Sequence, residues 1–249
     1  MPEVSRDAIL GLGLTLTQPK SGHRVGADAV LLAAAAGPPV KTLVDVGAGV
    51  GSVGLALLRR WPEATGEMIE IDPELAEFSR TNAEEAGMQA RAKVLRLDVF
   101  DKPARRAVGL KDGAADLVVT NPPFYDRTEV RISPDESRAR AHVLVESLEN
   151  WVVASLALLK PGGRFVMIHR PDGLNAILAG IGKRLGGVAI RPVYPKAETP
   201  AIRILVSGVK GSRAPLAIFP GLILHEADGR FTPEAAAIHR GEAQLSDFR

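Results

Sequence analysis

The sequence contains no cysteine, which excludes disulfide bonds, a thiolate nucleophile and zinc sites with cysteine ligands. Such an absence is typical of proteins in a reducing compartment, so we expect a cytoplasmic location. None of the five histidines is spaced from another as metal ligands are, and we expect no metal site. Aromatic residues make up only 4% of the chain, too few for a broad surface on which single-stranded nucleic acid stacks.

The chain also lacks a long hydrophobic run. Its most apolar stretch, 29–40, is short and is interrupted by Pro38 and Pro39, so it does not predict a membrane span. Residues 1–7 have neither a basic segment nor an apolar core, which argues against a signal peptide. We therefore expect no membrane partner.

Charge is nearly balanced, and the net charge of +2 indicates no partner by itself. Its distribution is uneven, because residues 183–213 contain one acid, Glu198, and seven basic residues: Lys183, Arg184, Arg191, Lys196, Arg203, Lys210 and Arg213. Such a stretch can form a phosphate-binding surface, or it can be a set of scattered, solvated cations. The sequence leaves both interpretations open.

The clearest local pattern is a strand, a glycine-rich turn and a helix. Residues 42–46 are apolar and partly β-branched, residues 47–54 are rich in glycine, and residues 55–60 are predicted to be helical. Glycines in such a turn let the backbone approach a ligand closely and expose amides at the helix N-terminus. The order predicts a cofactor-binding turn, although the same glycine spacing also fits a dinucleotide site.

Three acids stand where a nucleoside cofactor would be held. Glu70 lies in the next strand, about 20 residues past the glycines, where an acid binds ribose hydroxyls. Asp98 follows a third strand, 92–97, where it either meets an exocyclic amine or serves only as a helix cap. Asp45 precedes the glycines inside the strand end, where an acid attracts a cationic amine and repels a pyrophosphate.

A stiff corner follows the fourth strand. Residues 116–120 form an apolar run, and Asn121-Pro122-Pro123-Phe124 comes directly after it. Because prolines fix their own backbone angle, this loop can hold an amide and an aromatic ring in a set geometry. A planar amine would donate one proton to the Asn121 side chain and another to the Pro122 carbonyl, with Phe124 stacked on its ring. The alternative is an ordinary turn in which Asn121 bonds locally.

With these motifs the chain resembles the class I S-adenosylmethionine-dependent methyltransferases that methylate amino groups. Over nearly its whole length it is similar to the bacterial tRNA (adenine-N6) methyltransferase family. The segments that carry the likeness are Val44 to Phe124, Gln18 with His23 to Leu32, Leu159 to Phe165, Tyr194 to Lys196, Leu224 to Gly229, and Thr232 to Ala235. The resemblance implies S-adenosyl-L-methionine as cofactor, tRNA as nucleic-acid partner, and methyl transfer to N6 of adenine.

The resemblance also implies roles for individual residues. Those expected to bind the cofactor are Asp45, Gly47, Gly49, Gly51, Glu70, Asp98 and Asn121. Within this set, Asp45 is expected near the methionine amine, Glu70 on the ribose and Asp98 on the adenine amine. The residues expected to act in catalysis are Asn121, Pro122 and Phe124, and those expected to contact the substrate are Pro123, Tyr125 and Arg24.

The implied fold is α/β and Rossmann-like, with a seven-stranded, mostly parallel sheet, an antiparallel last strand and helices on both faces. We expect one methyltransferase domain over 1–249, made of an N-terminal extension (1–40), a core (41–212) and a C-terminal extension (213–249). Helices are expected at 29–36, 73–85, 143–159 and 174–185, and further strands at 10–17, 165–169, 188–193 and 202–209. Asp28 is expected to cap the first helix, and residues 160–164 are expected to form a turn.

Other functions stay open at this point. Relatives with the same amine motif methylate rRNA, DNA or a protein glutamine. The glycine spacing alone also fits an NAD-linked oxidoreductase. A third alternative is a non-catalytic RNA-binding module with a degenerate cofactor pocket, which the intact motif at Asn121 argues against. The oligomeric state is not predicted.

Overall fold

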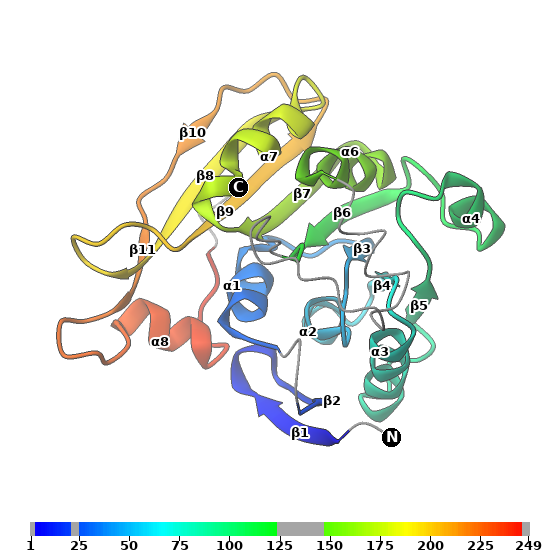
Figure 1. Ribbon diagram of the computed structural model, residues 1–249, viewed down its shortest axis with the longest axis horizontal. Coiled ribbons are helices and arrows are strands. Elements are labelled where there is room, and N and C mark those ends of the chain that lie inside the picture. The colour runs from blue at the N-terminus through cyan, green and yellow to red at the C-terminus, as the bar shows by residue number, and fades with distance from the viewer. Residues whose placement is uncertain (1–2, 21–24, 124–146, 246–249) are drawn as a thin grey trace, which may run out of the picture.

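The computed structural model describes residues 3–20, 25–123 and 147–245 of the chain (Figure 1). Within these residues the largest element is a nine-stranded sheet with the order β10-β8-β9-β7-β6-β3-β4-β5, in which β11 also pairs with β8. Its strands are β3 (Thr42–Val46), β4 (Thr65–Glu70), β5 (Ala92–Arg96), β6 (Ala115–Thr120), β7 (Leu159–His169), β8 (Leu185–Lys196), β9 (Arg203–Lys210), β10 (Ala217–Ile218) and β11 (Leu222–His225). The strands from β3 to β7 run parallel, and β9 is antiparallel to both β7 and β8.

This arrangement confirms the predicted fold, but the predicted number of seven strands is too low. The two additional strands, β10 and β11, come from the tail of the chain, and both pair with β8 in parallel. β10 is only two residues long, so no hydrophobic period marks it in the sequence. β8 has 12 residues, which gives it the length to pair with both segments along one edge.

Helices cover both faces of the sheet (Figure 1). One face packs against α1 (Ala27–Ala35), α2 (Ser52–Arg60), α3 (Pro73–Glu85) and α8 (Pro233–His239), and the other against α6 (Leu148–Leu158) and α7 (Leu174–Ile181). The shorter helical segments are α4 (Lys102–Ala107), η1 (Leu10–Leu12) and η2 (Pro171–Gly173). The sequence prediction missed α4, whose start carries a helix signal: Asp101 accepts a hydrogen bond from the Ala104 amide, with a proline in the first turn.

Alternate residues of each central strand contribute to the hydrophobic clusters on the two faces of the sheet. In β7, Phe165 and Met167 lie in the hydrophobic cluster with α6 and α7, whereas Val166 and Ile168 lie in the cluster with α1 and α2. Successive strand residues point to opposite faces, so a strand covered on both faces is apolar throughout. The unbroken apolar runs in the sequence are therefore the strands at the middle of the sheet.

The start of α1 differs from the prediction. Gly26, not Asp28, occupies the N-cap, and no side chain caps this helix. Asp28 lies in the first turn, where its Oδ2 accepts a 2.8 Å hydrogen bond from Nε of Arg203 at the start of β9. The local sequence predicts that the Asp28 carboxylate caps the helix, but in the structure this carboxylate pairs with an arginine 175 residues away.

The predicted turn at 160–164 is also wrong. Residues 160–164 lie within β7, where the pairing with β6 steps from Ala115↔Leu159 to Leu117↔Arg164. An added Cβ on Gly163 would lie 2.9 Å from the Ala115 carbonyl, so glycine permits this close approach. The described helix begins at Leu148, and the predicted residues 143–146 lie outside the described ranges.

An N-terminal hairpin of β1 (Val4–Ile9) and β2 (Leu14–Pro19) packs beside α3. β2 overlaps the end of the strand predicted at 10–17, whose first three residues form η1 instead. Asn82 of α3 fastens the hairpin, because its Oδ1 accepts a 2.7 Å bond from the Thr17 amide. The Asn82 Nδ2 donates to the carbonyls of Thr17 (3.0 Å) and Val50 (2.9 Å). One buried amide therefore links the hairpin to the glycine-rich turn.

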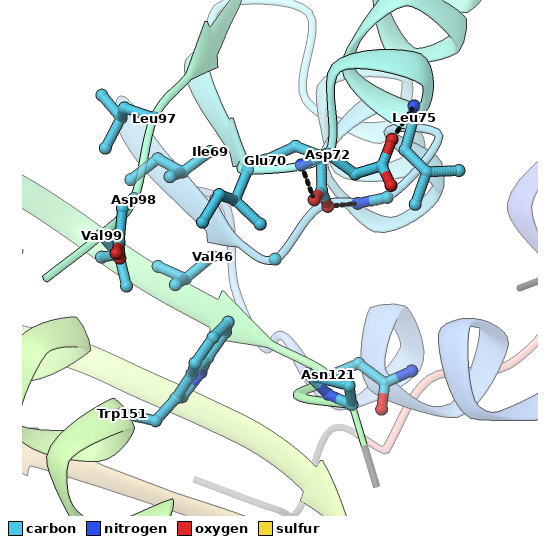
Figure 2. A pocket seen from close by; sticks show the side chains of 14 residues that line it. Val46, Ile69, Glu70, Asp72, Leu75, Leu97, Asp98, Val99, Asn121 and Trp151 are labelled. Atoms are coloured by element: carbon cyan, nitrogen blue, oxygen red, sulfur yellow. Dashed lines mark hydrogen bonds between the residues drawn. The ribbon is translucent and has the colours of Figure 1, made fainter. Parts of the chain in front are cut away.

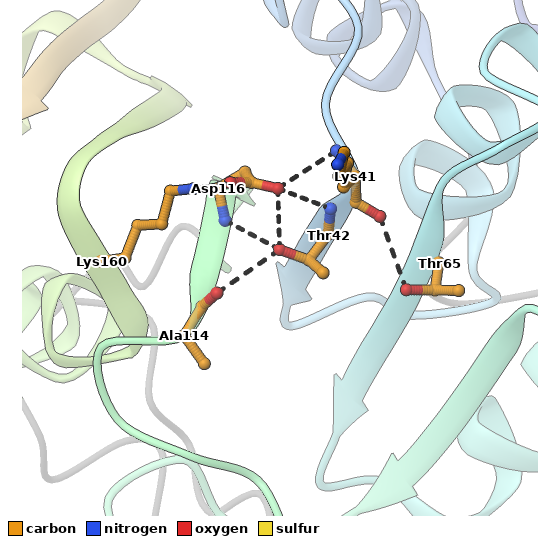
Figure 3. A network of polar contacts seen from close by, with 6 residues as sticks. All are labelled: Lys41, Thr42, Thr65, Ala114, Asp116 and Lys160. Carbon is orange, nitrogen blue, oxygen red and sulfur yellow. Dashed lines mark hydrogen bonds and ion pairs between the residues drawn. The ribbon is translucent and has the colours of Figure 1, made fainter.

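A polar network ties β3, β6 and β7 together at the amino ends of these strands (Figure 3). Asp116 accepts hydrogen bonds from the Lys41 amide (3.1 Å) and from the amide (2.8 Å) and hydroxyl (3.0 Å) of Thr42. Lys160 forms an ion pair with the same carboxylate. Burial opposes ionisation of Asp116, but the bonds from Lys160 and Thr42 outweigh it and lower its pKa to about 2.

In the three described ranges, no helix combines the length and the apolar character needed to cross a membrane. Within the same ranges, no three His, Asp or Glu side chains gather in an arrangement that would hold a metal ion.

Candidate active site

A cavity opens at the carboxyl ends of β3, β4, β5 and β6 (Figure 2). Its walls are mainly apolar, with Val46, Ile69, Leu75, Leu97 and Val99 among them. Polar groups come from the glycine turn, Glu70, Asp72, Asp98 and Asn121. In parallel α/β sheets ligands bind at this edge. We call this space the first cavity.

The glycine turn shapes one wall. Gly47, Gly49 and Gly51 have φ angles of +72°, +56° and +83°, in the left-handed region that favours glycine. The amides of Gly47 and Ala48 each donate a 2.9 Å hydrogen bond to the Ile69 carbonyl, which ties the turn to β4. An added Cβ on Gly47 would lie 3.0 Å from the Trp151 ring. Glycine is therefore required here both by the backbone angle and by the space.

Glu70 joins the turn to the end of β4. Its Oε2 accepts a 2.8 Å hydrogen bond from the Gly49 amide, and its Oε1 accepts a 2.8 Å bond from the Asp72 amide (Figure 2). Burial raises the pKa of the Glu70 carboxyl, and the two amides oppose that rise. Glu70 as a residue is 7% exposed and lines the first cavity, where its predicted ribose contact would occur.

Asp45 lies behind the turn and does not line the first cavity. Its Oδ2 accepts a 2.8 Å hydrogen bond from the Gly54 amide, within α2. Burial raises the pKa of Asp45 to about 7; the Gly54 bond lowers it and the charge of Glu70 raises it further. The acid in the strand end thus holds α2 against β3, and its predicted contact with the methionine amine stays a prediction.

Asp98 lines the first cavity and does not cap a helix, since the N-cap of α4 is Asp101; its contact with an exocyclic amine stays a prediction. The Asp98 Oδ1 accepts a 2.9 Å bond from the Phe100 amide, as in a local turn. Phe100 contacts Trp151 edge-to-face, with ring centroids 5.9 Å apart. The aromatic pair backs the Asp98 loop.

Trp151 is a site residue that the sequence analysis missed. It lies in the first turn of α6 and lines the first cavity. Its Nε1 donates a 2.9 Å hydrogen bond to Thr120 Oγ1, and that hydroxyl donates a 2.7 Å bond to the Val46 carbonyl. The sequence offered one signal for this residue: Trp151 is one of only two tryptophans in the chain. Its position under Gly47 comes from tertiary packing alone.

Asn121 stands at the end of β6, where the sequence analysis placed it. Its Oδ1 is buried and has no hydrogen-bond partner among the described residues. Pro122 beside it is buried, and Pro123 lines the first cavity. A buried acceptor without a donor is costly, so such an atom at a cavity wall marks a place for a ligand's N–H group. The predicted residues Arg24, Phe124 and Tyr125 lie outside the described residues.

A second cavity lies on the other side of Asn121 and Gly49, both of which line it too. Its further walls are the start of α1, the start of α2 and the facing ends of β8, β9 and β11. The ion pair between Asp28 and Arg203 borders it. We call this space the second cavity.

Five of the seven basic residues in 183–213 make contacts within the protein. Lys210 Nζ donates to the carbonyls of Leu156 (2.8 Å), in the last turn of α6, and Leu159 (2.6 Å), the residue after that helix. Arg191 is buried 4.0 Å from Glu234, with its guanidinium over the Phe219 ring. The other contacts are Arg184 to the Gly180 carbonyl, Lys196 to the Ala227 carbonyl and Arg203 to Asp28. These contacts favour the interpretation of scattered cations, most of which bind the protein itself.

Comparison with known proteins decides the family. The family model for the methyltransferase small domain matches residues 25–178, more than half of the chain. The chain belongs to the small-domain methyltransferase family. A relative from Porphyromonas gingivalis, named tRNA1(Val) (adenine(37)-N6)-methyltransferase, is 33% identical over 224 residues, which cover 85% of each chain. A release factor glutamine methyltransferase from Bifidobacterium longum is 29% identical over 137 residues, covering 51% of this chain and 47% of that protein.

Solved structures agree with this family. A predicted O-methyltransferase from Agrobacterium tumefaciens has a TM-score of 0.73 at 32% identity, covering 88% of this chain and 98% of that one. A geranyl diphosphate C-methyltransferase from Streptomyces coelicolor, solved with S-adenosyl-L-homocysteine, has a TM-score of 0.52 at 15% identity over 74% of each chain. The second likeness shows the fold alone. The predictions of a Rossmann-like methyltransferase fold and of methyltransferase activity are confirmed.

Proposed function

We propose that this small-domain methyltransferase transfers a methyl group from S-adenosyl-L-methionine to N6 of an adenine in a tRNA, in the cytoplasm. One observation supports the choice of an amine as acceptor: Asn121 Oδ1, at the wall shared by both cavities, is buried and has no hydrogen-bond partner in the described ranges 3–20, 25–123 and 147–245. The printed name of the Porphyromonas gingivalis relative supports adenine N6 and tRNA.

The residues of the first cavity fit the proposed cofactor. Glu70 is a buried acid whose carboxylate faces the cavity, which suits ribose hydroxyls, and Asp98 suits an amine at the far end of a nucleoside. Gly47 and Gly49 have no side chains, so the backbone of the turn itself forms that wall of the cavity, and their positive φ angles explain why glycine stands there. When bound, the cofactor supplies an electrophilic methyl group on a sulfonium sulfur. The chain's own residues then determine which nucleophile reaches it.

Asn121 and Pro122 would orient the acceptor amine. The Asn121 Oδ1 accepts one N–H group and the Pro122 carbonyl accepts the other, which fixes the plane of the amine and aims its lone pair at the methyl group. Methyl transfer would form an N–C bond as the S–C bond of the cofactor broke, and the nitrogen held by Asn121 and Pro122 would lose one proton to water. Positioning and acceptor dipoles facing the developing positive nitrogen account for the catalysis. The stacking role of Phe124 remains part of this proposal.

The alternatives differ in the acceptor. Relatives named for glutamine methylation match a smaller share of the chain than the tRNA enzyme does, which favours the tRNA base. The Agrobacterium tumefaciens protein carries a predicted O-methyltransferase name, and a hydroxyl could also donate to Asn121 Oδ1. An amine is favoured because its two N–H groups would satisfy both Asn121 Oδ1 and the Pro122 carbonyl, whereas a hydroxyl has one proton to donate. Membership of a methyltransferase family argues against the oxidoreductase.

The test is to incubate the protein with tRNA from a strain lacking its gene and with cofactor labelled in the methyl group, and then to identify the labelled nucleoside by mass spectrometry. The expected product is N6-methyladenosine. Label on another base, or only on a protein glutamine in a parallel reaction with bulk protein, would contradict the proposed acceptor.

A further inference from the structure

The second cavity begins where the first one ends. Gly49 and Asn121 line both spaces, so they form the boundary between them. A cofactor with its nucleoside in the first cavity, between Glu70 and Asp98, and its reactive methyl group at Asn121 has only its amino-acid end left to place. That end would then extend into the second cavity.

The charges of the second cavity match that end. Among the described residues lining it, Asp28 and Arg203 are the two ionisable ones, and the remainder are mostly apolar or glycine. The Arg203 Nε lies 2.8 Å from the Asp28 Oδ2, and the Arg203 Nη1 donates a 2.8 Å bond to the Ile202 carbonyl. The two side chains are 20% and 26% exposed, for Asp28 and Arg203 respectively. A fixed pair of opposite charges therefore borders an apolar space.

The helix ends on the same wall add positive potential. α1 begins at N-cap Gly26 and α2 at N-cap Gly51, and neither helix has a side-chain cap. Gly26 and Ser52, at these two starts, line the second cavity. The backbone amides and the dipole at a helix N-terminus favour an anion such as a carboxylate.

We propose that Asp28 and Arg203 recognise the zwitterionic amino-acid end of the cofactor, with the Asp28 carboxylate on the α-ammonium group and the Arg203 guanidinium on the α-carboxylate. This inference rests on the proposed function. It gives the ammonium a partner in the cavity, whereas Asp45 lies behind the glycine turn and lines neither space. A zwitterion satisfies both charges of the pair.

The competing occupant is a phosphate of the acceptor nucleic acid on Arg203. A phosphate has only negative charge, and Asp28 in direct contact with Arg203 would repel it. Charge complementarity favours the ligand that carries both signs. The experiment below includes an arm for each source of the anion.

The test measures binding of two ligands by calorimetry, S-adenosylhomocysteine and 5′-methylthioadenosine, which share the thioadenosine but not the amino-acid end. We expect Arg203→Ala and Asp28→Asn to weaken S-adenosylhomocysteine binding by about tenfold to a hundredfold and to leave methylthioadenosine binding unchanged. The control is Arg80→Ala, which removes an exposed ion pair with Glu77 on α3 and should change neither affinity. Unchanged S-adenosylhomocysteine binding in both variants, or equal weakening of both ligands, would overturn the inference.

A charge exchange separates recognition from folding. The double variant Asp28→Arg with Arg203→Asp keeps an ion pair at this place, so it should recover thermal stability without recovering S-adenosylhomocysteine affinity. Recovery of both would mean that the pair is only structural. Loss of tRNA binding with unchanged S-adenosylhomocysteine affinity would assign Arg203 to a phosphate. If the wild-type protein binds neither adenosyl ligand, the proposed function itself fails; if it binds both equally, only this inference fails.

Discussion

The backbone amide of Gly49 donates a 2.8 Å hydrogen bond to the Glu70 carboxylate, so the glycine turn and the acid at the end of β4 form one unit. The second oxygen of Glu70 accepts from the Asp72 amide, at the N-cap of α3. The two oxygens thus hold the turn after β3 and the start of α3 in a fixed relation. The nucleoside part of the site is therefore organised before any ligand binds, which reduces the ordering cost of binding.

Replacing Glu70 with alanine should weaken S-adenosylhomocysteine binding by about tenfold to a hundredfold, because the ribose loses its acceptor and the Gly49 amide loses its partner. The control is Glu67→Ala on the same strand. Glu67 pairs with Lys93 at 3.7 Å and does not line the first cavity, so its loss should leave the affinity unchanged. Calorimetry decides the point, and wild-type affinity in Glu70→Ala would refute the ribose assignment.

Gly47→Ala and Gly113→Ala should separate backbone strain from loss of the site. The two glycines have φ angles of +72° and +68°, so each alanine should cost about 1–2 kcal/mol in the free energy of unfolding. Only at Gly47 does the added Cβ approach Trp151, whereas nothing lies within 4 Å of a Cβ at Gly113. Both variants should unfold at lower urea concentration, but only Gly47→Ala should lose cofactor affinity. Equal affinity in the two would contradict the described turn.

Asp45 should make the protein less stable as pH rises. Its pKa is raised, mainly by burial, from 3.8 to about 7 in the folded state. The folded state therefore holds this proton more tightly than the unfolded chain, and the stabilisation, full below pH 3.8, is lost as pH rises through about 7. Asp45→Asn cannot ionise and still offers an oxygen to the Gly54 amide. Urea unfolding between pH 5 and about 8.5 should show the variant gaining stability over wild type as pH rises. A constant difference would mean that Asp45 titrates normally.

Asp116 should show the opposite pH dependence. Lys160 and Thr42 overcome the effect of burial and lower its pKa from 3.8 to about 2, so its stabilisation is present above pH 3.8 and is lost as pH falls through about 2. Asp116→Asn should lower the midpoint of thermal unfolding at neutral pH, and the difference should shrink in acid. Lys160→Met removes the same ion pair and should behave alike, with cofactor affinity unchanged in both. A difference that persists at low pH would assign the effect to packing.

Local patterns predicted most of the fold, and long-range contacts account for the errors. The helix Pro73–Glu85 has the predicted bounds because its signals are local. Asp72 caps its first turn, Pro73 occupies the first helical position, and the apolar residues follow at helical spacing. Asp28 also looks like a cap in its local sequence, yet Arg203, 175 residues away, takes its carboxylate. Tertiary contacts override such local preferences.

The residues of the candidate site also fall into two groups, those that local sequence predicts and those that only the tertiary structure reveals. Glu70, Asp98 and Asn121 were predictable because each follows an apolar run, and the carboxyl ends of parallel strands meet at one edge. Trp151 was not, because its place under Gly47 depends on how α6 crosses the sheet. The pairing of Asp28 with Arg203 likewise required the positions of α1 and β9 in space.

The most direct test of the central claim is the turnover of Asn121→Ala with tRNA at saturating cofactor. If the buried Oδ1 orients the acceptor amine, kcat should fall by about a hundredfold or more while S-adenosylhomocysteine binding is retained. Near-wild-type kcat in this variant would contradict the account.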